Sequence, residues 1–156
     1  MGLRYLRFLY VKKEVESESE RTGMHPLFTK ADALTHEVIG AAIEVHRQMG
    51  TGLIESIYER CLMRELELRG VPTVSQKLVP VEYKDVSVEE PLRFDVLADD
   101  CLLLELKAVD KVPPIHKAKL LTYMKLLDIP LGLVINFNEM ILKNGIYRMM
   151  LPNANR

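Results

Sequence analysis

The sequence has few of the features that would assign it to a specialised class of protein. Its 156 residues carry a formal net charge of −1, so no overall basic field attracts nucleic acid or an anionic membrane. No run of 18 apolar residues is present, and we therefore expect no membrane-spanning helix and no membrane partner. There is no internal repeat. Any binding to phosphate groups must depend on a local cluster of basic side chains.

Cysteine is scarce as well. The two cysteines, Cys61 and Cys101, have no CxxC spacing, so neither a zinc site nor a disulfide framework is expected. Two free thiols are typical of the reducing cytosol, and we predict a cytoplasmic location. The N-terminus, MGLRYLRFLYVKK, is basic and apolar. It lacks the long apolar region and the small-residue cleavage site of a signal peptide.

The composition is that of an ordinary globular domain. Hydrophobic residues make up 48% of the chain and charged residues 28%, and the length suffices for one domain with a core. Residues 1–23 are interpreted as an appendage, because a basic apolar piece is followed by the acidic run EVESESE. Met24 is an alternative start of the protein. Residues 24–156 are predicted to form a single domain.

Hydrophobic periodicity and turn residues divide this domain into helices and strands. The strand at 77–84 contains Pro80, which places it at a sheet edge or a bulge. The helix between strands 102–108 and 131–138 makes these two strands parallel, and the latter is apolar on both faces, as in a central strand. The fold class is therefore α/β, with a mixed sheet flanked by helices. Helices are predicted over residues 31–49, about 53–69 and about 113–127, and strands over 77–84, 92–98, 102–108, 131–138 and 146–150.

The strands at 92–98 and 102–108 have a register that follows from their pattern. In both, the even-numbered residues are apolar, so each strand has one wholly apolar face, and both faces must turn to the same core. Residues that oppose each other share a face, so even positions must oppose even positions. A two-residue turn would break this rule. The simplest solution is a three-residue loop over residues 99–101, which places Ala98 opposite Leu102.

This register collects four charged residues on the other face. Asp95 opposes Glu105, and Arg93 opposes Lys107. Two carboxylates this close repel each other unless a positive charge lies between them. One interpretation is a divalent cation such as Mg²⁺, which takes one or two carboxylates and keeps several waters. The alternative is a solvated outer face on which Arg93 and Lys107 neutralise the acids, and the short pattern alone favours this alternative.

Further motifs carry a resemblance to a known family. GLIESIY opens the second helix, and Asp95, Glu105 and Lys107 are followed in order by HKAKLLTYMKL and LGLVINFN. Over residues 33 to 150 or so, this arrangement resembles the GxxExxY family, a branch of the PD-(D/E)XK nuclease superfamily. The resemblance implies a restriction-endonuclease-like core, in which helices flank a central mixed sheet of four strands.

The resemblance also implies roles for individual residues. Asp95 and Glu105 would bind the metal, which would be Mg²⁺ with Mn²⁺ as a possible substitute. Lys107 would orient or activate the attacking water, and Glu55 matches an additional acidic residue that helps to hold the metal site. Tyr58 lies one helical turn after Glu55 and on the same side. Without the resemblance, a helix-surface pair or a half-buried structural tyrosine explains Glu55 and Tyr58 equally well.

The helix after Lys107 departs from the family pattern at one position. Related sequences carry Gln-x-x-x-Tyr there, and the matching residues are Lys119 and Tyr123. Tyr123 fits the pattern, whereas Lys119 replaces the amide. A lysine at this place could contact a phosphate, or it could weaken the site by adding a positive charge beside the metal. The departure bears on activity and leaves the predicted fold unchanged.

The same helix supplies the candidate surface for nucleic acid. Its lysines have no acidic residue among them between residues 111 and 125, which is the pattern of a local phosphate patch, although most lysine-rich helix faces are simply solvated. There is no aromatic stacking array, DNA-reading helix or zinc finger, so contact with the backbone is expected. The predicted contacts are Lys111, Lys117, Lys119 and Tyr123, with Lys125 in the same run.

The implied activity is hydrolysis of phosphodiester bonds, with DNA as the expected substrate. Two other functions stay open from the sequence. One is a module that binds nucleic acid or a protein without turnover, which the lysine at position 119 favours. The other is an interaction protein that assembles through apolar helix faces. A homodimer is compatible with all three functions.

Overall fold

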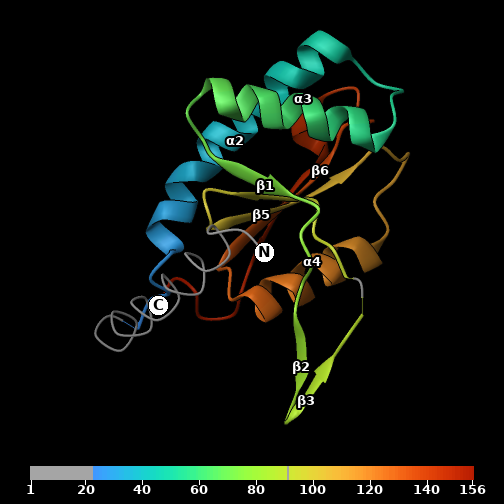
Figure 1. Cartoon of the computed structure of the whole chain (residues 1–156). Coiled ribbons are helices and arrows are strands. Elements are labelled where there is room, and N and C mark those ends of the chain that lie inside the picture. Colours follow the sequence, from blue (N-terminus) through green and yellow to red (C-terminus); the bar gives the residue numbers. More distant parts are fainter. Residues whose placement is uncertain (1–22, 91) are drawn as a thin grey trace.

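A mixed sheet of five strands lies between helices in the computed structural model, which describes residues 23–90 and 92–156 (Figure 1). Apart from Gly23, the predicted appendage falls outside the described residues. The order of the strands is β1-β4-β5-β6-β7. Their bounds are β1 (Thr73–Ser75), β4 (Val96–Ala98), β5 (Leu102–Lys107), β6 (Leu131–Asn136) and β7 (Ile146–Met150).

Three long helices flank the sheet. α2 (Phe28–Met49) and α3 (Glu55–Leu68) cover one face, and α4 (Pro114–Leu127) covers the other (Figure 1). A short 3-10 helix, η1 (Leu142–Gly145), precedes β7. The mixed sheet with flanking helices confirms the predicted fold class, with five strands in place of the four that the family resemblance implied. None of the helices within the described residues is long and apolar enough to cross a membrane.

The predicted register of the hairpin is confirmed. Ala98 pairs with Leu102 and Val96 with Leu104 in an antiparallel ladder, so the loop between the strands has three residues. Asp99 and Asp100 in this loop adopt left-handed backbone conformations, with φ of 43° and 58°. Aspartate tolerates this conformation better than most residues, because its short side chain can bond to the local backbone. The loop therefore fixes which residues of β4 and β5 share a face.

The crossover through α4 is also as predicted, because β5 and β6 are parallel, from Leu102 beside Leu131 to Lys107 beside Asn136. All residues of β6 are buried, as expected for a central strand. The even-numbered leucines of β5 pack in the core with α2 and α3. Leu103 and Val134 pack in a second core with α4. The face that carries Glu105 is thus covered by a helix, and a solvated outer face is excluded there.

The strand predicted over residues 77–84 is found only in part, as β2 (Val81–Tyr83) and an isolated bridge at Leu78. Residues 77–84 form no strand of the main sheet, and its edge is instead β1, which pairs with β4. The chain then leaves the sheet, because Gln76 has a left-handed φ of 52°. A separate hairpin follows, made of β2 and β3 (Val86–Val88), and it projects from the body of the molecule (Figure 1). Pro80 lacks the N–H that a continuous strand would use.

The strand predicted at residues 92–98 is also shorter than expected. Arg93 pairs with Leu78 in an isolated bridge, and the regular ladder of β4 begins only at Val96. The guanidinium of Arg93 donates a hydrogen bond of 2.8 Å to the carbonyl of Gln76. Arg93 is therefore tied to the segment that leads to the β2–β3 hairpin, and the ladder of β4 and β5 does not extend to its predicted pairing with Lys107.

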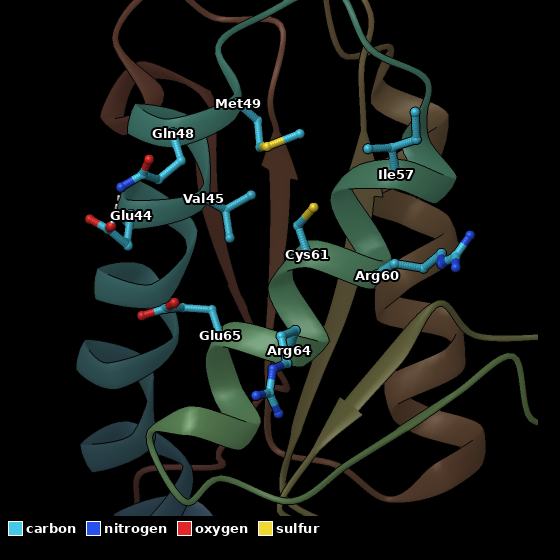
Figure 2. A pocket seen from close by; sticks show the side chains of 9 residues that line it. All are labelled: Glu44, Val45, Gln48, Met49, Ile57, Arg60, Cys61, Arg64 and Glu65. Atoms are coloured by element: carbon cyan, nitrogen blue, oxygen red, sulfur yellow. Dashed lines mark hydrogen bonds between the residues drawn. The ribbon is translucent and has the colours of Figure 1, made fainter.

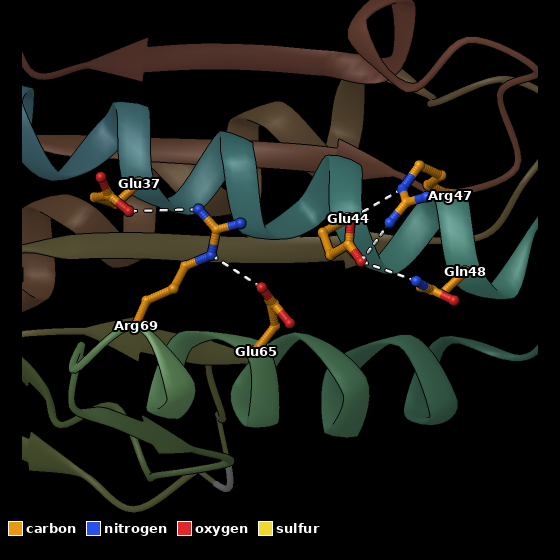
Figure 3. A network of polar contacts seen from close by, with 6 residues as sticks. All are labelled: Glu37, Glu44, Arg47, Gln48, Glu65 and Arg69. Carbon is orange, nitrogen blue, oxygen red and sulfur yellow. Dashed lines mark hydrogen bonds and ion pairs between the residues drawn. The ribbon is translucent and has the colours of Figure 1, made fainter.

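Ion pairs on the outer surface join α2 to α3. Arg69, at the end of α3, donates hydrogen bonds to Glu65 at 3.0 Å and to Glu37 of α2 at 3.4 Å (Figure 3). Gly40 makes room for this arginine, since a Cβ atom there would lie 3.0 Å from its Nη1. Exposed pairs of this kind contribute little to stability, and the helices are held mainly by their apolar faces.

A cavity of about 540 Å³ lies between α2 and α3. Figure 2 shows Val45 and Met49 of α2 and Cys61 of α3 turned toward it, with Arg60 and Arg64 at its edge. None of the residues predicted to act in catalysis or binding lines this space. The candidate site must therefore be sought at the sheet.

Candidate functional site

Glu105 is a buried carboxylate on β5, with 1% of the residue exposed. Its Oε1 atom accepts a hydrogen bond of 3.0 Å from Nζ of Lys119, which belongs to α4. Nζ of Lys107 lies 3.3 Å from the same oxygen. A charge that is removed from water in this way is tolerated only when opposite charges accompany it. Glu105 is therefore the centre of a small buried group of ions.

Asp95 lies directly before β4 and faces this group. Its Oδ2 atom accepts a hydrogen bond of 2.8 Å from the backbone N–H of Leu106, which anchors the carboxylate to the neighbouring strand. Burial raises the pKa of Asp95, and the negative charge of Glu105 raises it further. The Leu106 N–H and the two lysines act in the opposite direction. The acidic pair predicted from the register thus exists as two interacting carboxylates.

Lys107 connects Glu105 to the first turn of α3. Its Nζ atom lies 3.7 Å from Oε2 of Glu55, and only 12% of its side chain is exposed. Glu55 is the first residue of α3, where the partial positive charge of the helix N-terminus favours a carboxylate. The structure brings Glu55, Glu105 and Lys107 together, with the ammonium group of Lys107 contacting both acids.

Tyr58 does not face the acids. It is fully buried, and its ring stacks on Phe137 with the centroids 4.5 Å apart. Its hydroxyl donates to the carbonyl of Gly50 at 2.7 Å and accepts from the N–H of Leu53 at 3.2 Å. The structural interpretation of this tyrosine, which the sequence left open, is therefore correct. By fixing the loop before α3, Tyr58 sets the position of Glu55.

Glu59 is a further acid that the sequence interpretation missed. It lies one helical turn after Glu55, and this spacing was the available signal. Burial raises its pKa, with smaller contributions from Asp95 and Glu55, while a hydrogen bond from Gln76 lowers it. Gln76 donates from Nε2 to Glu59 at 2.9 Å and from its backbone N–H to the carbonyl of Asp95 at 3.0 Å. Gln76 therefore couples α3 to Asp95.

Asn136 supports the end of β5 from the neighbouring strand. Its buried side-chain amide accepts from the N–H of Val109 at 3.0 Å and donates to the carbonyl of Val109 at 2.8 Å. The N–H of Phe137 donates to the carbonyl of Lys107 at 2.8 Å. These bonds hold the chain just beyond Lys107, which keeps the lysine in place. The INFN motif, residues 135–138, thus supports the site by holding the backbone beyond Lys107 in place.

The predicted nucleic-acid contacts occupy different environments. Lys119 points to Glu105 and keeps 35% of its side chain exposed. Nζ of Lys117 lies 3.7 Å from the centroid of the Tyr147 ring, a cation–π contact. Tyr123 is buried, with its ring centroid 5.3 Å from Nζ of Lys119. Lys111 is exposed. Contact between these residues and nucleic acid stays a prediction.

The carboxylates of the buried ionic group can be compared with the ligands that a metal ion requires. Within residues 23–90 and 92–156, no three His, Cys, Asp or Glu side chains are grouped so as to hold an ion. Asp95 and Glu105 nevertheless offer hard carboxylate oxygens from adjacent strands, which suits Mg²⁺ because it takes one or two carboxylates and keeps much of its water. The donor set fits such an ion, and Lys119 lies on one of the oxygens it would use.

The sequence matches the family profile of the PD-(D/E)XK nuclease superfamily over residues 32–149, which is more than half of the chain. No curated protein and no solved structure matches the chain. The matched region begins in α2 and ends in β7, so it includes every residue of the buried ionic group.

Proposed function

Because the chain belongs to the PD-(D/E)XK nuclease superfamily, we propose that it is a Mg²⁺-dependent nuclease that hydrolyses the phosphodiester bonds of DNA. The observation that carries this proposal is the arrangement of Asp95, directly before β4, beside Glu105 and Lys107 of β5. Leu106 holds Asp95 through its N–H, and Lys107 lies 3.3 Å from Glu105. Nucleases of this superfamily generally use divalent metals, and the two carboxylates provide suitable oxygen ligands.

Each residue of the group has a role that follows from its position. Asp95 and Glu105 would hold the ion, and the ion when bound neutralises phosphate charge and lowers the pKa of water. Lys107 is held between Glu105 and Glu55, so its ammonium group can orient a water molecule or a phosphate oxygen with little loss of side-chain freedom. Glu55 supports the site by fixing Lys107, and it is available as a further ligand for the metal.

The surface that would bind DNA is local. The overall charge of −1 gives no general attraction to the phosphate backbone. Lys111, which precedes α4, and Lys125, which lies on it, are both exposed. α4 packs on the face of the sheet that carries Glu105. Tyr123 is buried beside Lys119 and would position that lysine. We propose contact with backbone phosphates, without reading of the base sequence.

Cleavage assays with purified protein test the activity. Single-stranded and double-stranded DNA and RNA are incubated with Mg²⁺ or Mn²⁺, and with excess chelator as the metal-free control. We expect cleavage of DNA that requires the metal and that Asp95→Asn and Lys107→Ala abolish. The matched control is Asp85→Asn, which changes an exposed acid in the turn between β2 and β3. Equal background cleavage by wild type and both site variants would refute the catalytic claim.

A binding module without turnover is the second candidate. The salt bridge between Lys119 and Glu105 favours it, because that ammonium group lies on an oxygen that the metal would need. In this case, fluorescence anisotropy with labelled oligonucleotides would show salt-dependent binding, while the oligonucleotides stay intact in the presence of Mg²⁺ or Mn²⁺. Binding together with metal-dependent cleavage would exclude this candidate.

A further inference from the structure

Lys119 forms a salt bridge with Glu105 in the buried ionic group. We propose that it is an internal counter-cation that competes with the divalent metal for Glu105, and that a phosphate of the nucleic acid draws it away. The metal and the nucleic acid would then bind cooperatively. This inference rests on the proposed function, since it assigns the metal and the phosphate to the same site. Its experiment, however, measures metal binding and does not depend on cleavage.

The competition follows from the geometry at one oxygen atom. Oε1 of Glu105 lies 3.0 Å from Nζ of Lys119 and 3.3 Å from Nζ of Lys107. A divalent cation on this oxygen would come close to both ammonium groups, and like charges at such distances repel strongly where water is scarce. Glu105 has 2% of its side chain exposed, so solvent cannot screen the repulsion effectively. One ammonium group must move before the cation binds well.

Lys119 is the lysine that can move. Lys107 is held by two acids and has 12% of its side chain exposed. Lys119 has 35% exposed, and Glu105 is the only acid within ion-pair distance of it in the described residues. Its Nζ atom lies 5.3 Å from the centroid of the buried Tyr123 ring, and the flexible four-carbon stem of a lysine allows the ammonium group to turn outward. Asp95 also faces it and attracts it more weakly.

A phosphate is the natural partner for the displaced ammonium group. It carries a negative charge and accepts hydrogen bonds, so it replaces what Lys119 loses when it leaves Glu105. When a phosphate already holds Lys119 outward, the metal no longer bears the free-energy cost of displacing it from Glu105 and therefore binds more tightly. By thermodynamic linkage the effect is reciprocal, so the metal must strengthen the binding of nucleic acid by the same factor.

Mn²⁺ binding measured by electron paramagnetic resonance tests the competition, because free Mn²⁺ gives a signal that bound Mn²⁺ loses. Wild type is compared with Lys119→Gln, which removes the charge and keeps a polar side chain of similar length. We expect Lys119→Gln to bind Mn²⁺ roughly 10-fold more tightly, within the usual range of coupling between two sites. Lys143→Gln is the matched control, since it removes an exposed lysine of η1 that has no part in the proposed site, and it should leave the affinity unchanged.

The cooperativity is tested with oligonucleotides that are cleaved slowly or not at all. A phosphorothioate oligonucleotide, which is charged, should raise the Mn²⁺ affinity of wild type and leave that of Lys119→Gln much less affected. A methylphosphonate oligonucleotide of the same sequence is neutral and should have no effect. The Glu105→Gln variant in the same mixtures reports the Mn²⁺ that the charged oligonucleotide binds by itself. Circular dichroism confirms that each variant is folded.

The outcomes separate this inference from the proposed function. Tighter Mn²⁺ binding by Lys119→Gln supports the inference even if no variant cleaves DNA, in which case the nuclease proposal fails alone. Equal or weaker binding by Lys119→Gln overturns the inference, whether or not wild type cleaves. An absence of measurable Mn²⁺ binding in both proteins also overturns it, because removal of the Lys119 charge would then not have made Glu105 available to the metal.

Discussion

The two faces of β5 have opposite characters, although the same six residues build both. The face toward α2 and α3 is made of Leu102, Leu104 and Leu106, and it contributes to a wholly apolar core. The face toward α4 begins with Leu103 and continues to Glu105, whose charge is buried with two lysines. Burying leucines stabilises a fold, whereas burying ions costs free energy that their mutual attraction only partly returns. The apolar face thus maintains the strand, and the proposed function accounts for the charged face.

Truncation on the apolar face should have the largest effect on stability. Leu104 is fully buried between the sheet and the helices α2 and α3. Leu104→Ala should lower the free energy of unfolding by about 2–5 kcal/mol, because it removes apolar contacts and leaves a cavity. Denaturant unfolding followed by circular dichroism measures this. Val86→Ala in the exposed hairpin is the control, with a change of no more than about 0.5 kcal/mol.

A change that pushes α4 from the sheet should have the next largest effect. A Cβ atom at Gly132 would lie 2.8 Å from Sδ of Met124 and 3.0 Å from the carbonyl oxygen of Leu103. Gly132→Ala should therefore cost about 1–3 kcal/mol in the free energy of unfolding, since part of the clash is with backbone. The same denaturant experiment measures it. Unchanged stability would mean that α4 packs on the charged face less closely than described.

Removal of both charges at the site should affect stability little. The double variant Glu105→Gln, Lys119→Met removes an ion pair whose desolvation offsets its attraction, so we expect stability within about 1 kcal/mol of wild type, or above it. Mn²⁺ binding should nevertheless be lost, as isothermal titration calorimetry would show. A loss of several kcal/mol would contradict the comparison, because it would make the charged face a source of stability.

The pH dependence contributed by Asp95 should be the smallest effect. Its pKa is raised in the folded protein by burial and by Glu105, so the folded state binds its proton more tightly than the unfolded state. Stability contributed by this group is therefore lost as the pH rises through the window between the unfolded pKa and the raised folded pKa. Asp95→Asn should gain stability relative to wild type across that window. Urea unfolding at several pH values measures the difference, and a constant difference would contradict the assignment.

The sequence predicted those parts of the site that depend on local alternation. Parity placed Asp95 beside Glu105 because the side chains of a strand alternate strictly between its faces, and a three-residue loop was needed to align the two leucine-rich faces. The βα crossover likewise predicted the parallel pair of β5 and β6. Each of these features can be predicted from a short stretch of sequence and a single rule of backbone geometry.

Features that depend on tertiary contacts were not predictable in this way. The alternation in β5 gave no indication that α4 covers its charged face, so the burial of Glu105 was missed. The charge of Lys119 beside the acids was one of two alternatives for this lysine, and it came from the family resemblance. Tyr58 shares a helix face with Glu55 by spacing alone, yet its ring packs on Phe137 from a distant strand end. The strand expected at 77–84 is reduced to β2 in a separate hairpin, because periodicity does not show where the chain leaves a sheet.

The central claim is that Asp95 and Glu105 form a metal site that Lys119 partly blocks. Anomalous diffraction from crystals of Lys119→Gln soaked in Mn²⁺ tests it most directly. We predict one strong peak within coordination distance of both carboxylates, and a weaker peak in wild-type crystals soaked in the same way. Crystals of Lys119→Gln with no peak at this place, and with Lys107 filling the space between the carboxylates, would contradict the claim.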